Sequence, residues 1–85
     1  MAADEKLTIL GEKIIVKYVD LISEDISGDA DVVKRTIRIE KKLNSKERQR
    51  VLAHEQFHMK LGLSGLSDLL DPKMEEALCT LAEIE

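Results

Sequence analysis

The chain lacks the residues that mark several protein classes. It has a single cysteine, Cys79, so no intramolecular disulfide can form and a reducing compartment is compatible with the sequence. No apolar run approaches the length that spans a membrane, and the first six residues lead into a charged segment rather than a signal peptide. We therefore expect a cytoplasmic protein with no membrane partner.

Positive charge and aromatic side chains are also scarce. The 13 Lys and Arg residues are outnumbered by 17 Asp and Glu residues, which gives a net charge of −4, whereas a nucleic-acid binder usually carries a basic patch. Nucleic acid is therefore not expected as a partner. Tyr18 and Phe57 are the only Tyr and Phe residues, so the core has to be built mainly from Leu, Ile, Val and Met. A chain of 85 residues is expected to form one domain, residues 1–85, that buries roughly 60% of its unfolded surface.

Two short strands are predicted near the N-terminus. Residues 7–10 and 13–20 flank Gly11-Glu12, and the second stretch is rich in β-branched residues, which favours two strands around a tight turn. Two inward-facing sets fit the second strand, and the pattern does not decide between them. They are Ile14, Val16 and Tyr18, or Ile15 and Val19.

A third strand is predicted over residues 33–40, where side chains alternate. Ile37 and Ile39 are expected to face the core, and Thr36, Arg38 and Glu40 to face solvent. The acidic residues 21–31 before it are predicted to form a solvated loop, because their glycine precedes the last two aspartates, the wrong order for an EF-hand calcium loop.

Residues 45–61 are predicted to form a helix. Asn44 is a good N-cap, Glu47 three residues later completes a capping box, and Gly62 is expected to end the helix. With about 100° per residue, the face centred on His54 is predicted to be the buried one. That face also contains Val51, Phe57, His58 and Leu61.

A second helix is predicted after a connection over residues 63–71. Asp71 is suited to cap this helix, and Pro72 is suited to its first position. Apolar side chains then recur with helical spacing on one face of it. They are Leu70, Met74, Ala77, Leu78 and Leu81.

The only two histidines, His54 and His58, belong to the sequence HEQFH, an HExxH motif. On a helix, the spacing of four projects both imidazoles from one face, where they can bind one zinc ion, and Glu55 lies on the side of a zinc-bound water. Imidazoles near a small core need polar partners, and a metal ion supplies one. The motif therefore predicts a zinc site.

A catalytic zinc normally has three protein ligands, so a third is needed after His54 and His58. Glu75 and Glu76 stand 17 and 18 residues after His58, at the start of the second helix. Glu75 is predicted at the border of the apolar face and Glu76 nearly toward solvent, so Glu75 is the preferred ligand and Glu76 the second candidate. Cys79 is also in reach, although it is more simply a small buried residue.

The outer nitrogens of the two histidines also need acceptors. Asp68 and Asp71 are candidates for this orienting role, and nothing in the sequence selects between them.

HEQFH followed by a glutamate on the next helix resembles the gluzincin pattern of zinc peptidases. The layout of strands, HExxH helix, glycine-containing turn and a helix opening with Glu-Glu-Ala-Leu is similar to the small phage-type and ImmA/IrrE-like minigluzincins, over residues 33–85. The resemblance implies His54, His58 and Glu75 as zinc ligands, Glu55 as the general base, and a peptide or protein as the substrate.

We therefore expect a small zinc peptidase, in which zinc lowers the pKa of its water toward ~7 and Glu55 takes the proton. The strand over residues 36–40 is expected to lie at the sheet edge and to align an extended peptide. The expected fold is α+β, a minimal zincin-like arrangement of a three-stranded sheet packed on the HExxH helix, with the second helix supplying the third ligand.

Two other functions compete with the peptidase. One is a non-catalytic, zinc-stabilised binding or regulatory module. The small size of the chain favours this function, and the presence of Glu55 disfavours it. The other is a helix-turn-helix DNA binder over residues 45–85, which is disfavoured because Lys73 is the only basic residue of the second helix.

Overall fold

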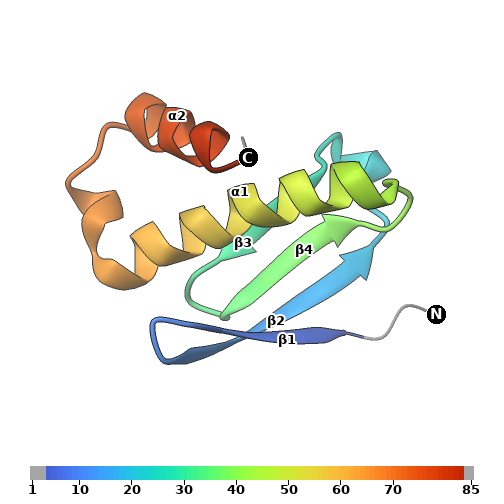
Figure 1. Ribbon diagram of the computed structural model, residues 1–85, viewed down its shortest axis with the longest axis horizontal. Helices are drawn as coiled ribbons and strands as arrows, with labels where there is room; N and C mark the ends of the chain where they lie inside the picture. The colour runs from blue at the N-terminus through green and yellow to red at the C-terminus, as the bar shows by residue number, and fades with distance from the viewer. Residues whose placement is uncertain (1–3, 84–85) are drawn as a thin grey trace.

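A four-stranded mixed sheet forms the base of the fold in the computed structural model, which describes residues 4–83 (Figure 1). The strands are β1 (Glu5–Ile9), β2 (Glu12–Val19), β3 (Gly28–Asp31) and β4 (Thr36–Glu40). Their order is β1-β2-β4-β3, in which β2 and β4 are parallel and the other two pairs are antiparallel. The fold is α+β, as expected, but the sheet has four strands rather than three.

The β1–β2 hairpin forms as predicted, but its turn lies one residue earlier, at Leu10-Gly11 rather than Gly11-Glu12. Leu10 and Gly11 join the strands with positive φ angles of 51° and 80°, as a two-residue turn between right-twisted strands requires. Of the two inward-facing sets, the structure has the first. Ile14 and Val16 are fully buried, and Tyr18 packs against the core.

Strand β3 lies where the sequence predicts a loop, so that prediction is wrong for residues 28–31. A short 3₁₀ helix, η1 (Ile22–Glu24), precedes the strand. On its inner side, β3 has only glycine and alanine, because it lies close to the helix α1 (Ser45–Ser64). A Cβ atom on Gly28 would lie 2.7 Å from Cγ1 of Val51. Small residues placed for close packing give no alternating apolar pattern, which is why the strand was missed.

Strand β4 lies between β2 and β3, so its expected position at the sheet edge is wrong, and β1 and β3 are the edges. It also begins three residues later than predicted. Arg35 has a φ of 52° in the turn that joins β3 to β4, and Val33 is 88% exposed there. Ile37 and Ile39 are fully buried, as predicted.

Glu40, predicted to face solvent, is buried instead. Its Oε1 accepts a hydrogen bond from the backbone N–H of Leu21, and its Oε2 accepts one from that of Lys42, both at 2.8 Å. The carboxylate thus satisfies backbone donors of the segments that follow β2 and β4.

The helix α1 begins as predicted and ends later. The Asn44 side chain accepts from the N–H of Glu47 at 2.9 Å, and the Glu47 side chain accepts from the N–H of Asn44 at 3.2 Å. Gly62 does not end the helix, which continues to Ser64 and is capped by Gly65 with a φ of 82°. Gly62 is needed for another reason, since a Cβ atom there would collide with the side chain of Val32.

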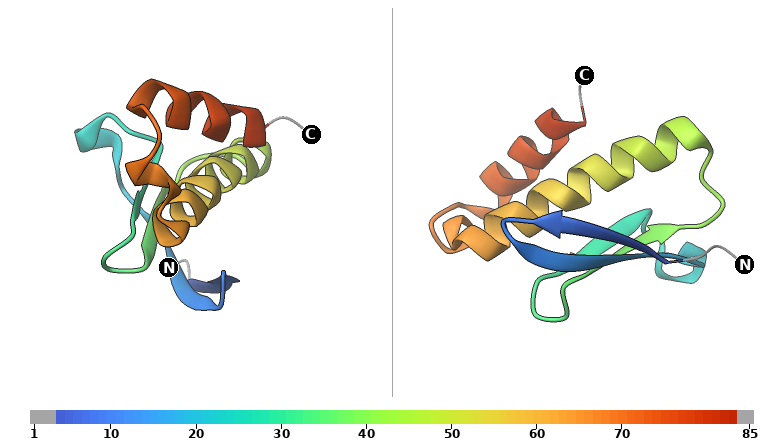
Figure 2. Two further views of the ribbon diagram at one scale, coloured as in Figure 1. Left: turned by 90° about the vertical axis from the view of Figure 1, so that its left-hand side faces the viewer. Right: turned by 60° about the horizontal axis from the view of Figure 1, so that its bottom comes forward.

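The helix α1 lies between the sheet and a second helix, α2 (Pro72–Ala82) (Figures 1 and 2). The buried residues of α1 are Glu55, Met59 and Leu61. His54 and His58 keep 15% and 22% of their side-chain surface exposed, so their predicted place in the middle of the buried face is wrong. They lie at its border because they face α2 rather than the sheet.

The helix α2 turns a side of mixed polarity toward α1, with Glu75 and Cys79, and most of its predicted apolar face outward. It begins as predicted, with Asp71 accepting from the N–H of Lys73 at 2.8 Å and Pro72 in the first position. Met74 and Leu81, on the apolar face, are 55% and 61% exposed, whereas Cys79 is fully buried. A short 3₁₀ helix, η2 (Leu66–Asp68), lies in the connection between the two α-helices.

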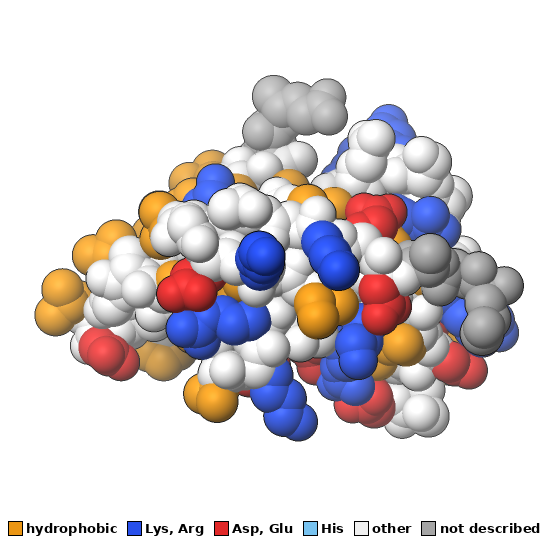
Figure 3. Space-filling view, turned by 90° about the horizontal axis from the view of Figure 1, so that it is seen from below, with side chains coloured by type: hydrophobic (Ala, Val, Ile, Leu, Met, Phe, Trp, Pro, Cys, Tyr) orange, Lys and Arg blue, Asp and Glu red, His pale blue; other side chains and the backbone are white. Residues whose placement is uncertain are grey.

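The surface shows no concentration of positive charge on the face drawn in Figure 3. Lys and Arg side chains are interspersed there with acidic and apolar ones. Among residues 4–83, no helix is both long enough and apolar enough to cross a membrane.

Candidate metal centre

The two helices bring most of the predicted site residues together. His54 and His58 project from α1 one turn apart, with their ring centroids separated by 4.9 Å. Glu75 and Glu76 project toward these rings from the first half of α2. The cap at Asp71 fixes where α2 begins, and a shift of one residue would rotate the glutamates by about 100° around the helix axis.

Glu76 lies at the Nε2 atoms of both histidines. Its Oε1 is 2.7 Å from Nε2 of His54, and its Oε2 is 3.2 Å from Nε2 of His58. The sequence favours Glu75 on the assumption that the apolar face of α2 turns toward the core. Because that face turns outward, the glutamate expected nearly in solvent lies over the two rings, although its side chain is still 60% exposed.

Two further carboxylates contact the Nδ1 atoms. Glu75 Oε2 is 2.7 Å from Nδ1 of His58, and Glu83 Oε2 is 2.8 Å from Nδ1 of His54. Acceptors at these outer nitrogens fix the orientation of the rings. Sequence reasoning missed Glu83, although its spacing of seven residues, or two turns, after Glu76 places both on one side of α2.

The aspartates considered for this role lie elsewhere. Asp71 caps α2, and Asp68 is exposed in η2. The contacts to the outer nitrogens come from Glu75 and Glu83 instead.

A count of protons shows that a cation fits this cluster. Four contacts join the two rings to carboxylate oxygens. A neutral imidazole has one N–H, so two neutral rings can donate to only two of the four, and the other two contacts set a nitrogen lone pair against an oxygen lone pair. Protonation of both rings relieves this conflict, and so does a metal ion at the Nε2 atoms. Two imidazoles and a carboxylate are a suitable donor set for such an ion.

The pKa values respond to the same contacts. Burial lowers the pKa of His54, but the hydrogen bond to Glu83 and the charges of Glu76 and Glu55 outweigh burial, so the pKa is raised. Burial likewise opposes ionisation of Glu75, but hydrogen bonds from Ser67 and His58 prevail and lower its pKa. Both shifts favour pairing of an imidazolium with a carboxylate.

Cys79 lies in the same cluster. Its Sγ and one nitrogen from each histidine all lie within 4.8 Å of one another, so His54, His58 and Cys79 are also compatible with a metal ion. Burial, together with the charges of Glu75 and Glu76, raises the pKa of the thiol to about 12. The thiolate is the metal-binding form of cysteine, and a bound metal ion would itself promote the loss of this proton.

Glu55 and strand β3 form the other side of the site. A cavity of about 390 Å³, the metal cavity, is lined by both histidines, by Glu55, Glu75 and Glu76, and by residues 28–30. Burial raises the pKa of Glu55 against the opposing charges of the histidines. A neighbouring cavity of about 330 Å³, the Val51 cavity, is lined by Val51, Ile26, Glu55 and Glu83 among others. The site therefore opens along the β3 edge of the sheet.

Comparisons of this chain with protein-family models, with curated proteins and with solved structures found no match. The likeness to gluzincins therefore stays an expectation carried by the motif, and the functional argument depends on the geometry of the cluster.

Proposed function

We propose that this protein is a zinc-dependent peptidase in which the metal is bound by Nε2 of His54, Nε2 of His58 and the carboxylate of Glu76. The observation that carries the proposal is the approach of a single carboxylate to both Nε2 atoms, at 2.7 and 3.2 Å. Glu55 directly follows His54 and lines the same cavity, which suits it to be the general base of an HExxH site.

Glu76 is favoured over Glu75 and Cys79 as the third ligand. Glu75 contacts Nδ1 of His58, on the other side of the ring from Nε2, which suits an orienting partner rather than a ligand. Sγ of Cys79 lies within 4.8 Å of one nitrogen of each histidine, whereas the Glu76 oxygens approach the two Nε2 atoms at 2.7 and 3.2 Å. Glu75 is the alternative ligand, and the two assignments predict different losses of zinc on substitution.

Zinc suits a donor set of two imidazole nitrogens and one carboxylate oxygen, because a tetrahedral site then keeps one position for water. A zinc ion held there supplies a Lewis acid that acidifies water and polarises a peptide carbonyl.

The proton transfers fall to Glu55. Its carboxylate lies in the metal cavity, where it can accept a proton from the attacking water and pass it to the leaving amine. Glu75 and Glu83 keep the two imidazoles oriented through their Nδ1 atoms.

Strand β3 is suited to align the substrate. It is an edge strand that borders the metal cavity, and an extended peptide can pair with its backbone. Gly28 lies near Val51, and Val32 lies near Gly62, so β3 and α1 run in the same direction. A substrate paired antiparallel to β3, the commoner arrangement, would run from His58 toward Val51.

Metal content and peptide hydrolysis together test the proposal. Untagged protein is expected to hold about one zinc ion per chain and to cleave a mixed peptide library, with activity lost on chelation. Glu55→Gln is the matched control, which should keep zinc and lose about 10²–10⁴-fold in activity. Zinc uptake without cleavage by the wild type would favour the non-catalytic zinc module, and a folded protein that takes up no zinc would contradict both functions.

A further inference from the structure

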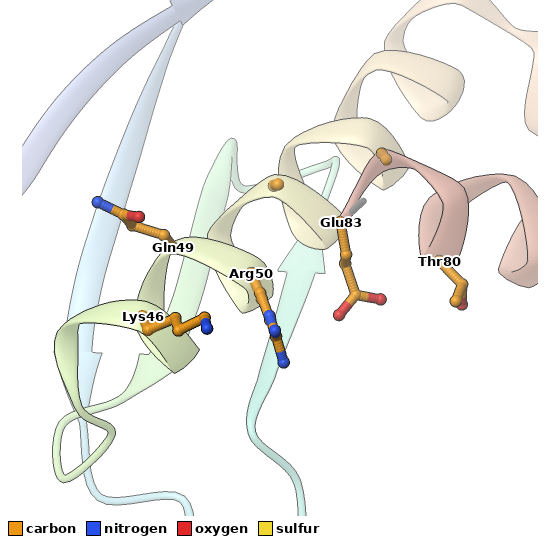
Figure 4. Close-up of a pocket in the computed structure, with 7 residues that line it drawn as sticks. Lys46, Gln49, Arg50, Thr80 and Glu83 are labelled. Atoms are coloured by element: carbon orange, nitrogen blue, oxygen red, sulfur yellow. The ribbon is translucent and has the colours of Figure 1, made fainter. Parts of the chain in front are cut away.

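A third cavity, of about 530 Å³, lies beside the metal centre, between the first half of α1 and the end of α2. Lys46 and Arg50 line it from α1, and Thr80 and Glu83 line it from α2 (Figure 4). Lys46 and Arg50 are one turn apart on the same side of the helix. We call this space the cationic cavity.

The two cations of this cavity are available to a ligand. Within residues 4–83, neither Lys46 nor Arg50 takes part in an ion pair, whereas Arg38 pairs with Glu24 and Asp29. Figure 4 shows Arg50 between Lys46 and Glu83. The Glu83 carboxylate also lines this cavity, and it accepts a hydrogen bond from Nδ1 of His54 at 2.8 Å rather than forming an ion pair with either cation.

Local electrostatics oppose placing two cations here. Lys46 lies in the first turn of α1, where the helix dipole favours negative charge. Like charges four residues apart on a helix also repel each other. A sequence that departs from such local preferences often does so at a functional position. In a chain with a net charge of −4, this basic pair points to an anionic ligand.

The cationic cavity lies where the C-terminal part of a bound peptide would reach. Glu83 lines both this cavity and the Val51 cavity, so the two adjoin. Along α1, Arg50 is about 6 Å and Lys46 about 12 Å before His54, at 1.5 Å per residue. An extended peptide advances about 3.3 Å per residue, so along the axis of α1 the basic pair lies the length of about two to four peptide residues beyond His54.

We propose that Lys46 and Arg50 bind a carboxylate of the substrate, about two to four residues after the scissile bond. This inference rests on the proposed peptidase function and on the direction of the substrate along β3. The carboxylate belongs either to an acidic side chain or to the C-terminus of the peptide, which present the same chemistry. The guanidinium of Arg50 can bind it through two N–H groups, and Lys46 adds a second charge.

Peptide probes anchored at the metal test this site without turnover. Each probe has a zinc-chelating hydroxamate at its N-terminus, in place of the scissile group, and a neutral spacer. The last residue is glutamate amide, glutamine amide or glutamine with a free carboxylate. It is placed second, third or fourth after the hydroxamate, so that the probes differ in length. Binding to zinc-loaded protein is measured by calorimetry.

At the fitting length, a probe with a carboxylate is expected to bind about tenfold more tightly than the glutamine amide. The variant Lys46→Gln/Arg50→Gln should bind all probes equally while still taking up zinc. The control Lys13→Gln/Lys17→Gln removes the same charge from exposed positions of β2 and should keep the preference. Tighter binding of the glutamate amide would show that the site takes an acidic side chain. Tighter binding of the glutamine probe with a free carboxylate would show that it takes the C-terminus of a peptide.

The inference is overturned if no length shows a preference, or if the preference survives Lys46→Gln/Arg50→Gln. Its failure is separable from failure of the peptidase function. Tighter binding of the carboxylate probes without peptide cleavage would support the carboxylate site and contradict the peptidase function. Peptide cleavage without tighter binding of the carboxylate probes would support the peptidase function and contradict the carboxylate site. A protein that binds no zinc overturns both.

Discussion

Two clusters among residues 4–83 join several carboxylates to basic side chains, and only the cluster around Arg38 has an N–H donor for every carboxylate contact. Arg38 donates to Asp29 at 2.9 Å and to both oxygens of Glu24 at 3.2 Å. A guanidinium keeps its charge and has five N–H groups, so each of these contacts joins a donor to an acceptor. At the candidate metal centre, four contacts with carboxylate oxygens involve two imidazoles, each of which has only one N–H when neutral.

The difference is instructive because both clusters look alike as charge patterns in the sequence. The Arg38 cluster contains its own permanent cation and serves to join β3 and η1 to β4. The histidine cluster needs protons or a metal ion from outside. An imbalance between donors and acceptors, rather than the number of charges, therefore distinguishes the cluster that we propose to bind a metal ion from the cluster around Arg38.

The largest effect is expected from Glu76→Ala. This substitution removes the carboxylate that meets both Nε2 atoms, so zinc content should fall from about one ion per chain to near zero. Elemental analysis after gel filtration measures it, with Arg38→Gln as the variant that should keep its zinc. Full zinc content in Glu76→Ala, with loss in Glu75→Ala, would assign Glu75 as the ligand.

Substitution of the orienting carboxylates is expected to have a smaller effect. Glu75→Gln and Glu83→Gln should each weaken zinc binding by about 10–100-fold, because the rings lose their charged acceptors. Competition with a chromogenic chelator gives the affinities. Unchanged affinity in both variants would mean that the Nδ1 contacts do not support the metal.

The metal-free protein should respond to pH in the opposite sense to the zinc-loaded protein. The pKa of His54 is raised above 6.5, so its protonation stabilises the folded state below that pH, and this contribution is lost as the pH rises through the raised value. The free energy of unfolding of chelator-treated protein should therefore fall as the pH rises from 6.5 through the raised pKa of His54. Zinc-loaded protein should gain stability over that range, since zinc binds deprotonated rings.

Urea unfolding at several pH values measures this difference. His54→Gln should flatten the profile of the metal-free protein over the same range. A metal-free wild type whose stability rises with pH would contradict the raised pKa.

The smallest effect is expected from substitution in the Arg38 cluster. Arg38→Gln should lower the free energy of unfolding by no more than about 1 kcal/mol, because the side chain is 35% exposed and its charges are screened. Denaturant unfolding at low and high salt measures the loss, which should shrink as salt is added. A loss that is insensitive to salt would show that Arg38 acts through packing.

The predictions that succeeded depend on local chemistry. The capping box at Asn44, the Asp71-Pro72 start of α2 and the alternation around Ile37 each involve neighbours within a few residues. The HEQFH spacing likewise fixes the relation of His54 to His58 once the helix forms. These features could be predicted because backbone geometry alone determines them.

The predictions that failed depend on which surfaces meet. Strand β3 is made by pairing with β4 and by close approach of Gly28 to α1, neither of which its acidic sequence reveals. The burial of Glu40 follows from backbone donors in two connections. The apolar face of α2 suggests a buried side, but the contacts with His54 and His58 turn the opposite side inward. Glu83 was missed for the same reason.

The outward apolar side of α2 affects how this protein opens. Within residues 4–83, the main hydrophobic core consists of residues from the sheet, from α1, and from the segments that follow β3 and precede α1. None of its residues belongs to α2. The apolar burial of α2 is limited to the fully buried Cys79 and the half-buried Leu78 and Ala82, so we expect the histidine–carboxylate contacts, with the proposed zinc ion, to contribute to holding it. Hydrogen exchange should then divide the molecule into a slowly exchanging sheet with α1 and a C-terminal unit that opens on its own once the metal leaves. In this arrangement the proposed zinc ion would stabilise a local folding unit as well as supply the proposed chemistry.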